Sequence, residues 1–383
     1  MRGTDHQRLV TYWGGAYILD KQGQVWNLIK GKSGSFEHPE AVDQSALGDA
    51  KVVSIAGGST HALVLDSNGQ VWAWGSNTYG ALGCCALYDE DGLDLEHPDQ
   101  PAPVAVDLTA LEGAKVVAID ASHHLSVALD ELGRVWAWGA YWGNALWGTF
   151  DPGIPKQVDL NALEGAKVMS LSYGDYHLLL LDETGQIWAS GDNDYGQLGI
   201  GYPGQLRCNA HAVFCRVDQS ALGGDKVVAI QGARRSSLAL DASGRVWAWG
   251  VDWSGSLGTG DPDPSLDPSY VRTPTQVQFE PGVAVSAISA LGTSDALLAL
   301  DGAGQLWEWG GLNMGFTNTP ERLDQSVLGD YRPMYFSANG TVWLEVTAVD
   351  EIGRLWSWDA STLREMIEQV DDSAAGDNPW LSD

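Results

Sequence analysis

The sequence predicts an all-β protein, a seven-bladed β-propeller built from four-stranded antiparallel blades. Three observations predict it: one segment returns seven times at a spacing of about 55 residues, each copy reads as short strands, and helical periodicity is almost absent. Four antiparallel strands cannot cover both of their faces alone, so the copies must stack on one another. We therefore expect one propeller domain over residues 1–383, with repeats from about 8 to 372 and a short tail at 373–383.

The repeat is clearest in four copies of the segment. These copies begin at Lys51, Lys115, Lys167 and Lys226. The first reads KVVSIAGGSTHALVLDSNGQVWAWG and the second KVVAIDASHHLSVALDELGRVWAWG, while weaker copies lie near the start of the chain and near residues 284 and 335. Their number predicts seven blades.

Each copy predicts four strands in order. The KVVSI-like and HALVLD-like segments are the first and second strands, because both are rich in β-branched or aliphatic residues. A D-x-x-G sequence follows, whose glycine suits a left-handed position in a tight hairpin. The VWAW segment is the third strand and a short V-D element is the fourth. Of the eighteen tryptophans, those of the third strands are expected to pack in the core or between blades.

The string GGSTHALVLDSNGQVWAWGSNTYGALG resembles the repeat of the regulator of chromosome condensation family of seven-bladed propellers, over nearly the whole chain. The resemblance implies a bacterial-type member of that family. Known relatives include an exchange factor for the small GTPase Ran, a plant UV-B photoreceptor and a secreted bacterial β-lactamase inhibitor, so the fold does not fix the function. The photoreceptor's Gly-Trp-Arg-His-Thr unit occurs in no copy here, so UV sensing is not expected.

Composition narrows the classes of partner. The chain has 21 Lys and Arg against 50 Asp and Glu, a net charge of −29, which disfavours nucleic acids and anionic membranes and favours a basic protein partner.

No apolar run is long enough to span a membrane, and the start MRGTDHQ lacks the apolar core of a signal peptide, so the chain is made without one or is a processed form. Acidity and loop-confined cysteines favour a secreted or periplasmic bacterial setting and leave a cytoplasmic one open.

The blades differ most in the loop after the third strand, which is long in blades two to five. In a four-stranded meander this loop lies at the same end as the turn between the first two strands, so both are expected to share one face. That turn holds two variable positions per blade, with mixed Trp, His, Asp, Tyr and Arg, and such residues anchor binding surfaces. The corresponding positions of the plant photoreceptor hold Trp and Arg at its dimer face. The predicted binding residues are Trp13, His123, His124, Tyr176, Arg234, Arg235, Trp142, Trp253 and Trp343.

Histidines and cysteines suggest further sites. His61 and His177 begin second strands and are expected to be structural, whereas His123 and His124 lie in a turn. The cysteines, all in long loops, are Cys84, Cys85, Cys208 and Cys215. Three alternatives stay open for them: disulfides, which join Cys208 to Cys215 or blade two to blade four and need an oxidising compartment; free thiols; or a metal held by Cys208, His211 and Cys215, although zinc needs a fourth ligand. No cofactor is expected, and the acidic run at 88–96 is a solvated loop rather than a calcium site.

The leading hypothesis is a propeller that binds a protein or peptide on the long-loop face of blades two to five. The alternative is an enzyme on the same face, whose candidate catalytic residues are His123, His124, Asp175, Tyr176 and Asp295. A third hypothesis, nucleotide exchange on a small GTPase, rests on the family resemblance alone. The sequence lacks a phosphate-binding glycine loop and a nucleophile elbow, which favours binding over catalysis.

Overall fold

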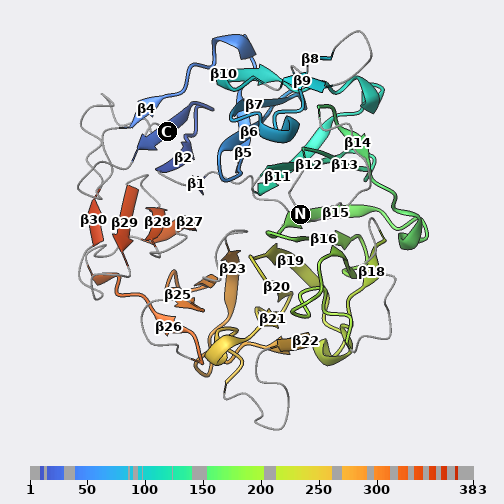
Figure 1. Ribbon diagram of the computed structural model, residues 1–383. Coiled ribbons are helices and arrows are strands. Elements are labelled where there is room, and N and C mark those ends of the chain that lie inside the picture. The colour runs from blue at the N-terminus through green and yellow to red at the C-terminus, as the bar shows by residue number, and fades with distance from the viewer. Residues whose placement is uncertain are drawn as a thin grey trace. The chain divides into compact units, whose positions relative to one another are not determined.

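The computed structural model describes residues 9–12, 15–29, 39–84, 87–88, 94–96, 98–122, 124–139, 153–201, 213–260, 270–290, 297–310, 318–326, 332–339, 345–350, 355–359 and 367–369. These residues form seven four-stranded antiparallel sheets, which confirms the predicted seven-bladed β-propeller (Figure 1). In this part of the chain no helix is long and apolar enough to cross a membrane.

The chain divides into two compact units, and the first holds the described residues up to Asn161, which are blades one to three. Blade one is β1 (Leu9–Tyr12), β2 (Gly15–Leu19), β3 (Val25–Ile29) and β4 (Glu40–Ala41). Blade two is β5 (Val52–Gly57), β6 (His61–Asp66), β7 (Val71–Gly75) and β10 (Gln100–Ala105), with a small hairpin, β8 (Leu87–Tyr88) and β9 (Asp94–Glu96), inserted before β10. Blade three is β11 (Val116–Ser122), β12 (Leu125–Asp130), β13 (Val135–Gly139) and β14 (Lys156–Gln157).

The second unit holds blades four to seven, from Ala162 onward. Blade four is β15 (Val168–Tyr173), β16 (His177–Asp182), β17 (Ile187–Gly191) and β18 (Cys215–Arg216). Blade five is β19 (Val227–Gly232), β20 (Ser236–Asp241), β21 (Val246–Val251) and β22 (Tyr270–Gln276). Blade six is β23 (Val285–Ala290), β24 (Leu297–Asp301), β25 (Leu306–Trp309) and β26 (Glu321–Arg322), and blade seven is β27 (Pro333–Asn339), β28 (Glu345–Asp350), β29 (Leu355–Asp359) and β30 (Ile367–Gln369). The first strands of successive blades in this unit lie side by side.

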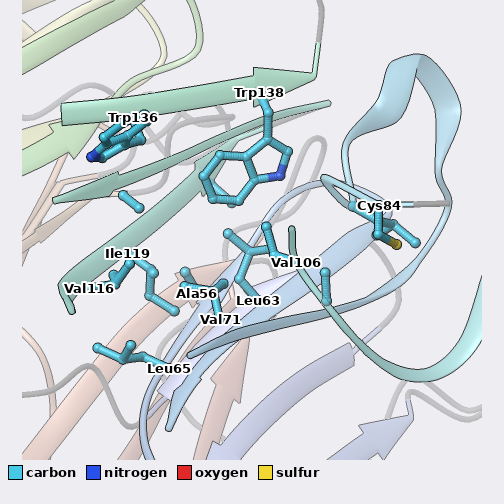
Figure 2. Packing of buried hydrophobic residues seen from close by; sticks show 14 of the residues in the cluster. Ala56, Leu63, Leu65, Val71, Cys84, Val106, Val116, Ile119, Trp136 and Trp138 are labelled. Atoms are coloured by element: carbon cyan, nitrogen blue, oxygen red, sulfur yellow. The ribbon is translucent and has the colours of Figure 1, made fainter. Parts of the chain in front are cut away.

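Most third-strand tryptophans of the described residues are buried, as the sequence predicts, whereas Trp26 and Trp72 are half-buried. In the first unit, Trp136 and Trp138 of β13 are buried among Leu63, Val71 and Ile119 from blades two and three (Figure 2). Trp138 and its counterpart Trp249 in blade five are both fully buried. Because these rings join one blade to the next, the packing supplies the stacking that a single four-stranded sheet lacks.

A buried aspartate closes the second strand of every blade and binds the first tryptophan of the third strand. In all seven blades the indole Nε1–H donates to the Asp Oδ2, at 2.9–3.0 Å, six residues away in the chain. In six blades the Asp Oδ1 also accepts two backbone N–H groups of the following turn, as Asp66 does from Asn68 and Gln70. The D-x-x-G turn and the tryptophan are therefore one hydrogen-bonded unit.

Two buried histidines link neighbouring blades, as expected of structural residues. The His61 Nε2 lies 2.9 Å from Ser126 Oγ in the next blade, and Ser126 Oγ and Trp138 Nε1 both donate to the Ala81 carbonyl. The second unit repeats this contact: His177 Nε2 lies 2.7 Å from Ser237 Oγ, and Ser237 Oγ and Trp249 Nε1 both donate to the Gln197 carbonyl. We call this arrangement the His–Ser link; it joins blade two to three and blade four to five.

We expect the free energy of unfolding to fall by about 2 kcal/mol between pH 7 and pH 5 through His177. Burial lowers the pKa of His177 from 6.5 to about 3, so the unfolded chain takes up a proton in this range that the folded chain does not. The stability from neutral His177 is therefore complete above pH 6.5 and is lost as the pH falls. Urea unfolding at both pH values, with His177→Gln as the comparison, measures the effect. An equal pH dependence in the Gln variant would contradict the assignment.

Candidate functional site

The first turns of blades four and five are tight and carry two residues at the tip. In blade four the Gly174 N–H donates to the His177 carbonyl at 2.9 Å, which leaves Asp175 and Tyr176 at the tip. In blade five the Ala233 N–H donates to the Ser236 carbonyl at 2.9 Å, with Arg234 and Arg235 between them. Since this closing bond uses backbone groups alone, the two residues at the tip are free to differ from blade to blade.

The tip of each turn is fixed to the end of the third strand. The Tyr176 carbonyl accepts the Asp192 N–H at 2.9 Å, and the Arg235 carbonyl accepts the Val251 N–H at 3.0 Å. A glycine with positive φ lies at this point: Gly191 with φ 122° ends β17, and Gly250 with φ 111° is the last residue but one of β21. These contacts place the first turn and the loop after the third strand at the same end of the blade, as the sequence analysis expects.

The Arg235 guanidinium contacts two aromatic rings. Its guanidinium carbon is 5.0 Å from the ring centroid of Tyr195, which follows the third strand of blade four, and 5.3 Å from that of Trp253, which follows the third strand of blade five. The two rings are edge-on to each other, with centroids 6.1 Å apart. All three side chains are half-buried. Both rings therefore hold the guanidinium through cation–π contacts while part of it reaches solvent.

Two residues of β22 extend this cluster. The Tyr270 ring packs against the Tyr195 ring with centroids 5.5 Å apart, and the Arg272 guanidinium carbon lies 5.7 Å from the Tyr270 centroid. We call Tyr195, Arg235, Trp253, Tyr270 and Arg272 the arginine–aromatic cluster. It combines three aromatic rings and two cations at the ends of blades four and five.

Asp175 and Arg234 join the tips of the two neighbouring turns. The Asp175 Oδ2 lies 3.6 Å from Arg234 Nε, and the carboxylate side chain is 1% exposed against 33% for the arginine. The Asp175 N–H also donates to the Ala233 carbonyl at 3.3 Å. Asp175 therefore positions the blade-five turn, which carries Arg235, rather than lying open as an acid–base group.

The first unit contains a smaller version of the same arrangement. The Tyr79 ring, after the third strand of blade two, packs edge-on to the His124 ring in the first turn of blade three, with centroids 5.5 Å apart. Tyr79 occupies the same place in its blade as Tyr195, and His124 the same place as Arg235. Tyr79 is held at φ 59°, a region that disfavours a side chain, so the packing around it fixes an uncommon backbone.

Two carboxylates near the cluster have structural partners. The Asp252 Oδ1 accepts the Leu257 N–H at 2.9 Å, just as Asn193 Oδ1 accepts the Leu198 N–H at 3.0 Å in blade four. The Asp192 Oδ1 accepts the Asp194 N–H at 3.1 Å. Burial raises the pKa values of both Asp192 and Asp252. These acids therefore shape the loops that carry Tyr195 and Trp253.

The structure brings together five of the predicted site residues: Asp175, Tyr176, Arg234, Arg235 and Trp253. Tyr195, Tyr270 and Arg272 are additions that sequence reasoning missed, although Tyr79 and Tyr195 share the string N-x-Y-G, which could have indicated a repeated aromatic position. The remaining predicted residues lie outside the described part of the chain, apart from His124 and Cys215. They are Trp13, His123, Trp142, Cys208, His211, Asp295 and Trp343.

The two described cysteines are not free thiols. Cys84 and Cys215 are each disulfide-bonded, so the free-thiol reading is wrong for them and Cys215 cannot offer a thiolate to a metal. Cys85 and Cys208 lie outside the described residues, and the two disulfide pairings considered above stay open. Within the described ranges no group of three or more His, Cys, Asp or Glu could hold a metal ion.

Several segments of the sequence match models of a known protein family. Models of the regulator of chromosome condensation (RCC1) repeat match residues 52–81 and 169–197, and residues 68–129 and 243–292. The first two segments each contain the aspartate and the tryptophan that are hydrogen-bonded to each other. These matched segments of the chain are similar to the RCC1 repeat.

The chain is similar to curated proteins with different roles. It is 27% identical over 294 residues to the guanine nucleotide exchange factor SRM1 of Saccharomyces cerevisiae, covering 71% of this chain and 59% of the relative. It is 28% identical over 275 residues to the ultraviolet-B receptor UVR8 of Arabidopsis thaliana, covering 71% and 57%. It is 32% identical over 198 residues to the human E3 ubiquitin-protein ligase HERC2, covering 49% of this chain and 4% of that protein. The alignments thus span less than two thirds of the length of each relative. These three relatives, from yeast, a plant and human, do not support the expected bacterial type.

Solved structures show the same fold. The chain superposes on Prp20p of Saccharomyces cerevisiae with a TM-score of 0.70 at 22% identity, covering 97% of this chain and 88% of the other. The yeast protein bound to Kap60 gives a TM-score of 0.69 at 22% identity, covering 94% and 84%. At this level of identity the likeness extends to the fold alone.

Proposed function

We propose that this propeller is a protein- or peptide-binding module whose recognition surface is formed by the first turns and third-strand loops of blades two to five. The observation that carries the proposal is Arg235, held against Tyr195 and Trp253 at the tip of a fixed turn. Tyr, Trp and Arg are the residues most enriched among those that dominate binding energy.

The support comes from how this surface is built. The turn backbones are fixed by hydrogen bonds to the third strands, so the exposed residues are held in place before a partner arrives. The aromatic rings of the arginine–aromatic cluster are half-buried rather than packed away in the core. A preorganised surface of this kind loses less side-chain entropy on binding than a mobile loop does.

We expect the double substitution Arg235→Ala and Trp253→Ala to weaken capture of a partner protein more than about tenfold, because each side chain is of the type whose truncation costs most at interfaces. The measurement is quantitative affinity capture with immobilised protein, followed by titration of the recovered partner. Arg322→Ala is the matched control, since Arg322 also stacks on a tryptophan at 5.0 Å but lies on the fourth strand of blade six. Equal loss in both variants, or no loss in either, would remove the assigned surface.

A second candidate function is guanine nucleotide exchange. It is favoured by the likeness to the yeast exchange factor SRM1, of which this chain matches 59%, and by yeast Prp20p, whose solved structure was studied with binding to Gsp1p and histones. Accelerated release of labelled GDP from a Ran-type GTPase would support this role. A catalytic role draws no such support, because Asp175 is paired with Arg234 and His124 packs against Tyr79.

The disulfides bear on where such a module works. Cys84 and Cys215 are both bonded, and disulfides persist in oxidising compartments. This supports an exported protein. Four thiols that react with an alkylating reagent in the freshly purified, unreduced protein would contradict it.

A further inference from the structure

We infer that the arginine–aromatic cluster binds an acidic segment of a partner protein, with carboxylates of that segment on Arg235 and Arg272. This inference rests on the proposed function and names the chemistry of the partner. It differs from the expectation drawn from net charge, because a docked side chain meets the groups in contact with it rather than the average charge of the chain.

The two arginines have unused hydrogen-bonding capacity. Among the described residues, the guanidinium groups of Arg235 and Arg272 contact aromatic rings and form neither a hydrogen bond nor an ion pair. Stacking occupies the faces of a guanidinium, whereas its N–H groups point outward in its plane. A bidentate acceptor can therefore bind the edge of each arginine without disturbing the rings.

The other polar groups of the cluster are also able to donate. The Tyr195 and Tyr270 hydroxyls and the Trp253 Nε1–H have no hydrogen-bond partner among the described residues, and all three side chains are half-buried. A tryptophan N–H is a donor and cannot accept, and neither arginine can accept. A ligand that satisfies this set supplies acceptors, and carboxylates are the strongest acceptors among protein side chains.

Three acidic residues of the neighbouring loops have partners within the protein, whereas Asp194 is exposed. Asp175 is paired with Arg234, while Asp192 and Asp252 accept backbone N–H groups of their own loops. None of these three carboxylates forms an ion pair with Arg235 or Arg272 in the described part of the chain.

The net charge of −29 does not prevent this contact. At physiological ionic strength the Debye length is about 8 Å, so charges farther away are largely screened, whereas a carboxylate in contact with a guanidinium is screened far less. The net charge instead lowers the rate of approach, and moderate salt raises it.

The test uses a capped octapeptide of glutamate and its octaglutamine counterpart, titrated into full-length protein with labelled arginine side chains. The readout is the NMR signal of each arginine Nε–H, which detects millimolar binding; Arg235→Lys and Arg272→Lys assign the two signals. We expect the glutamate peptide to shift both signals saturably, with a Kd of about 1 mM or tighter, and the glutamine peptide to bind at least about tenfold more weakly. Arg235→Ala should weaken the glutamate peptide about tenfold, and Arg322→Ala should leave it unchanged.

Several results would overturn the inference. These are no shift at several millimolar peptide, equal binding of the glutamine peptide, or a phosphoserine peptide that binds about tenfold more tightly than glutamate. A dimer of this chain that requires Arg235, in the absence of peptide binding, would assign the surface to a second copy instead. If partner capture depends on Arg235 while the glutamate peptide fails, the acidic ligand is wrong and the binding surface stands; if capture does not depend on Arg235, the surface itself is wrong.

Discussion

Replacing Gly139 with alanine is expected to lower the free energy of unfolding by more than about 4 kcal/mol, a loss large enough to unfold a marginal domain. Gly139 ends β13 with φ 86°, and a Cβ there would lie 2.1 Å from the His124 carbonyl oxygen. The clash falls on the backbone of the first turn, where Leu125 pairs with Gly139 in the ladder, so neither side can move away cheaply. Urea unfolding followed by tryptophan fluorescence measures the loss.

Gly113→Ala is the matched control for this prediction. Gly113 has φ 88°, close to that of Gly139, but a Cβ there meets nothing within 4 Å. Its substitution should cost about 1–2 kcal/mol, the penalty for a side chain in the left-handed region. The difference between the two variants isolates the close approach of the turn to the strand. Equal losses would show that backbone conformation alone, and not the clash, sets the cost.

Replacing Asp241 with alanine is expected to cost about 3–5 kcal/mol. This carboxylate is 1% exposed and accepts from the Ser243 and Arg245 backbone N–H groups, the Trp247 Nε1–H and the Arg245 Nε–H. Alanine leaves the buried indole N–H without an acceptor and removes the ion pair with Arg245, which lies 2.7 Å away. Denaturant unfolding at pH 7 gives the change in stability.

Asp301→Ala separates the contribution of the ion pair with arginine from that of the hydrogen bonds to the indole and the turn. Asp301 accepts the Trp307 indole and the turn N–H groups in the same way, but Gln305 stands in the place of Arg245. We expect Asp301→Ala to cost about 1–2 kcal/mol less than Asp241→Ala, because only Asp241 accepts a charge-assisted hydrogen bond from an arginine. A smaller loss at Asp241 than at Asp301 would mean that the arginine contributes nothing to the blade.

The sequence predicted the fold because one short pattern determines each blade. The glycine of D-x-x-G identifies the hairpin, and the alternating VWAW segment identifies the strand after it. The role of the aspartate was missed because an Asp before a turn is already explained by turn preference. The constant spacing of six residues to tryptophan was visible, but the hydrogen bond that explains it needs the folded hairpin.

The candidate site was predictable only in part. Counting back from the closing aspartate locates the turn tips, so Arg234, Arg235 and their counterparts could be identified from the chain alone. Tyr195 and Tyr270 could not, because their contacts with Arg235 and Trp253 depend on how loops of different length return to neighbouring blades. Spacing along the chain carries no information on those paths.

The His–Ser link has an uneven distribution that bears on local motion. It joins blade four to five, whereas blade five has Ser236 at the histidine position and blade six has Leu297 at the serine position. Amide hydrogens of blades four and five should therefore exchange with solvent together and slowly, in one cooperative opening unit. The turn that carries Arg234 and Arg235 belongs to this linked pair of blades, so we expect a ligand to meet a backbone that is already ordered.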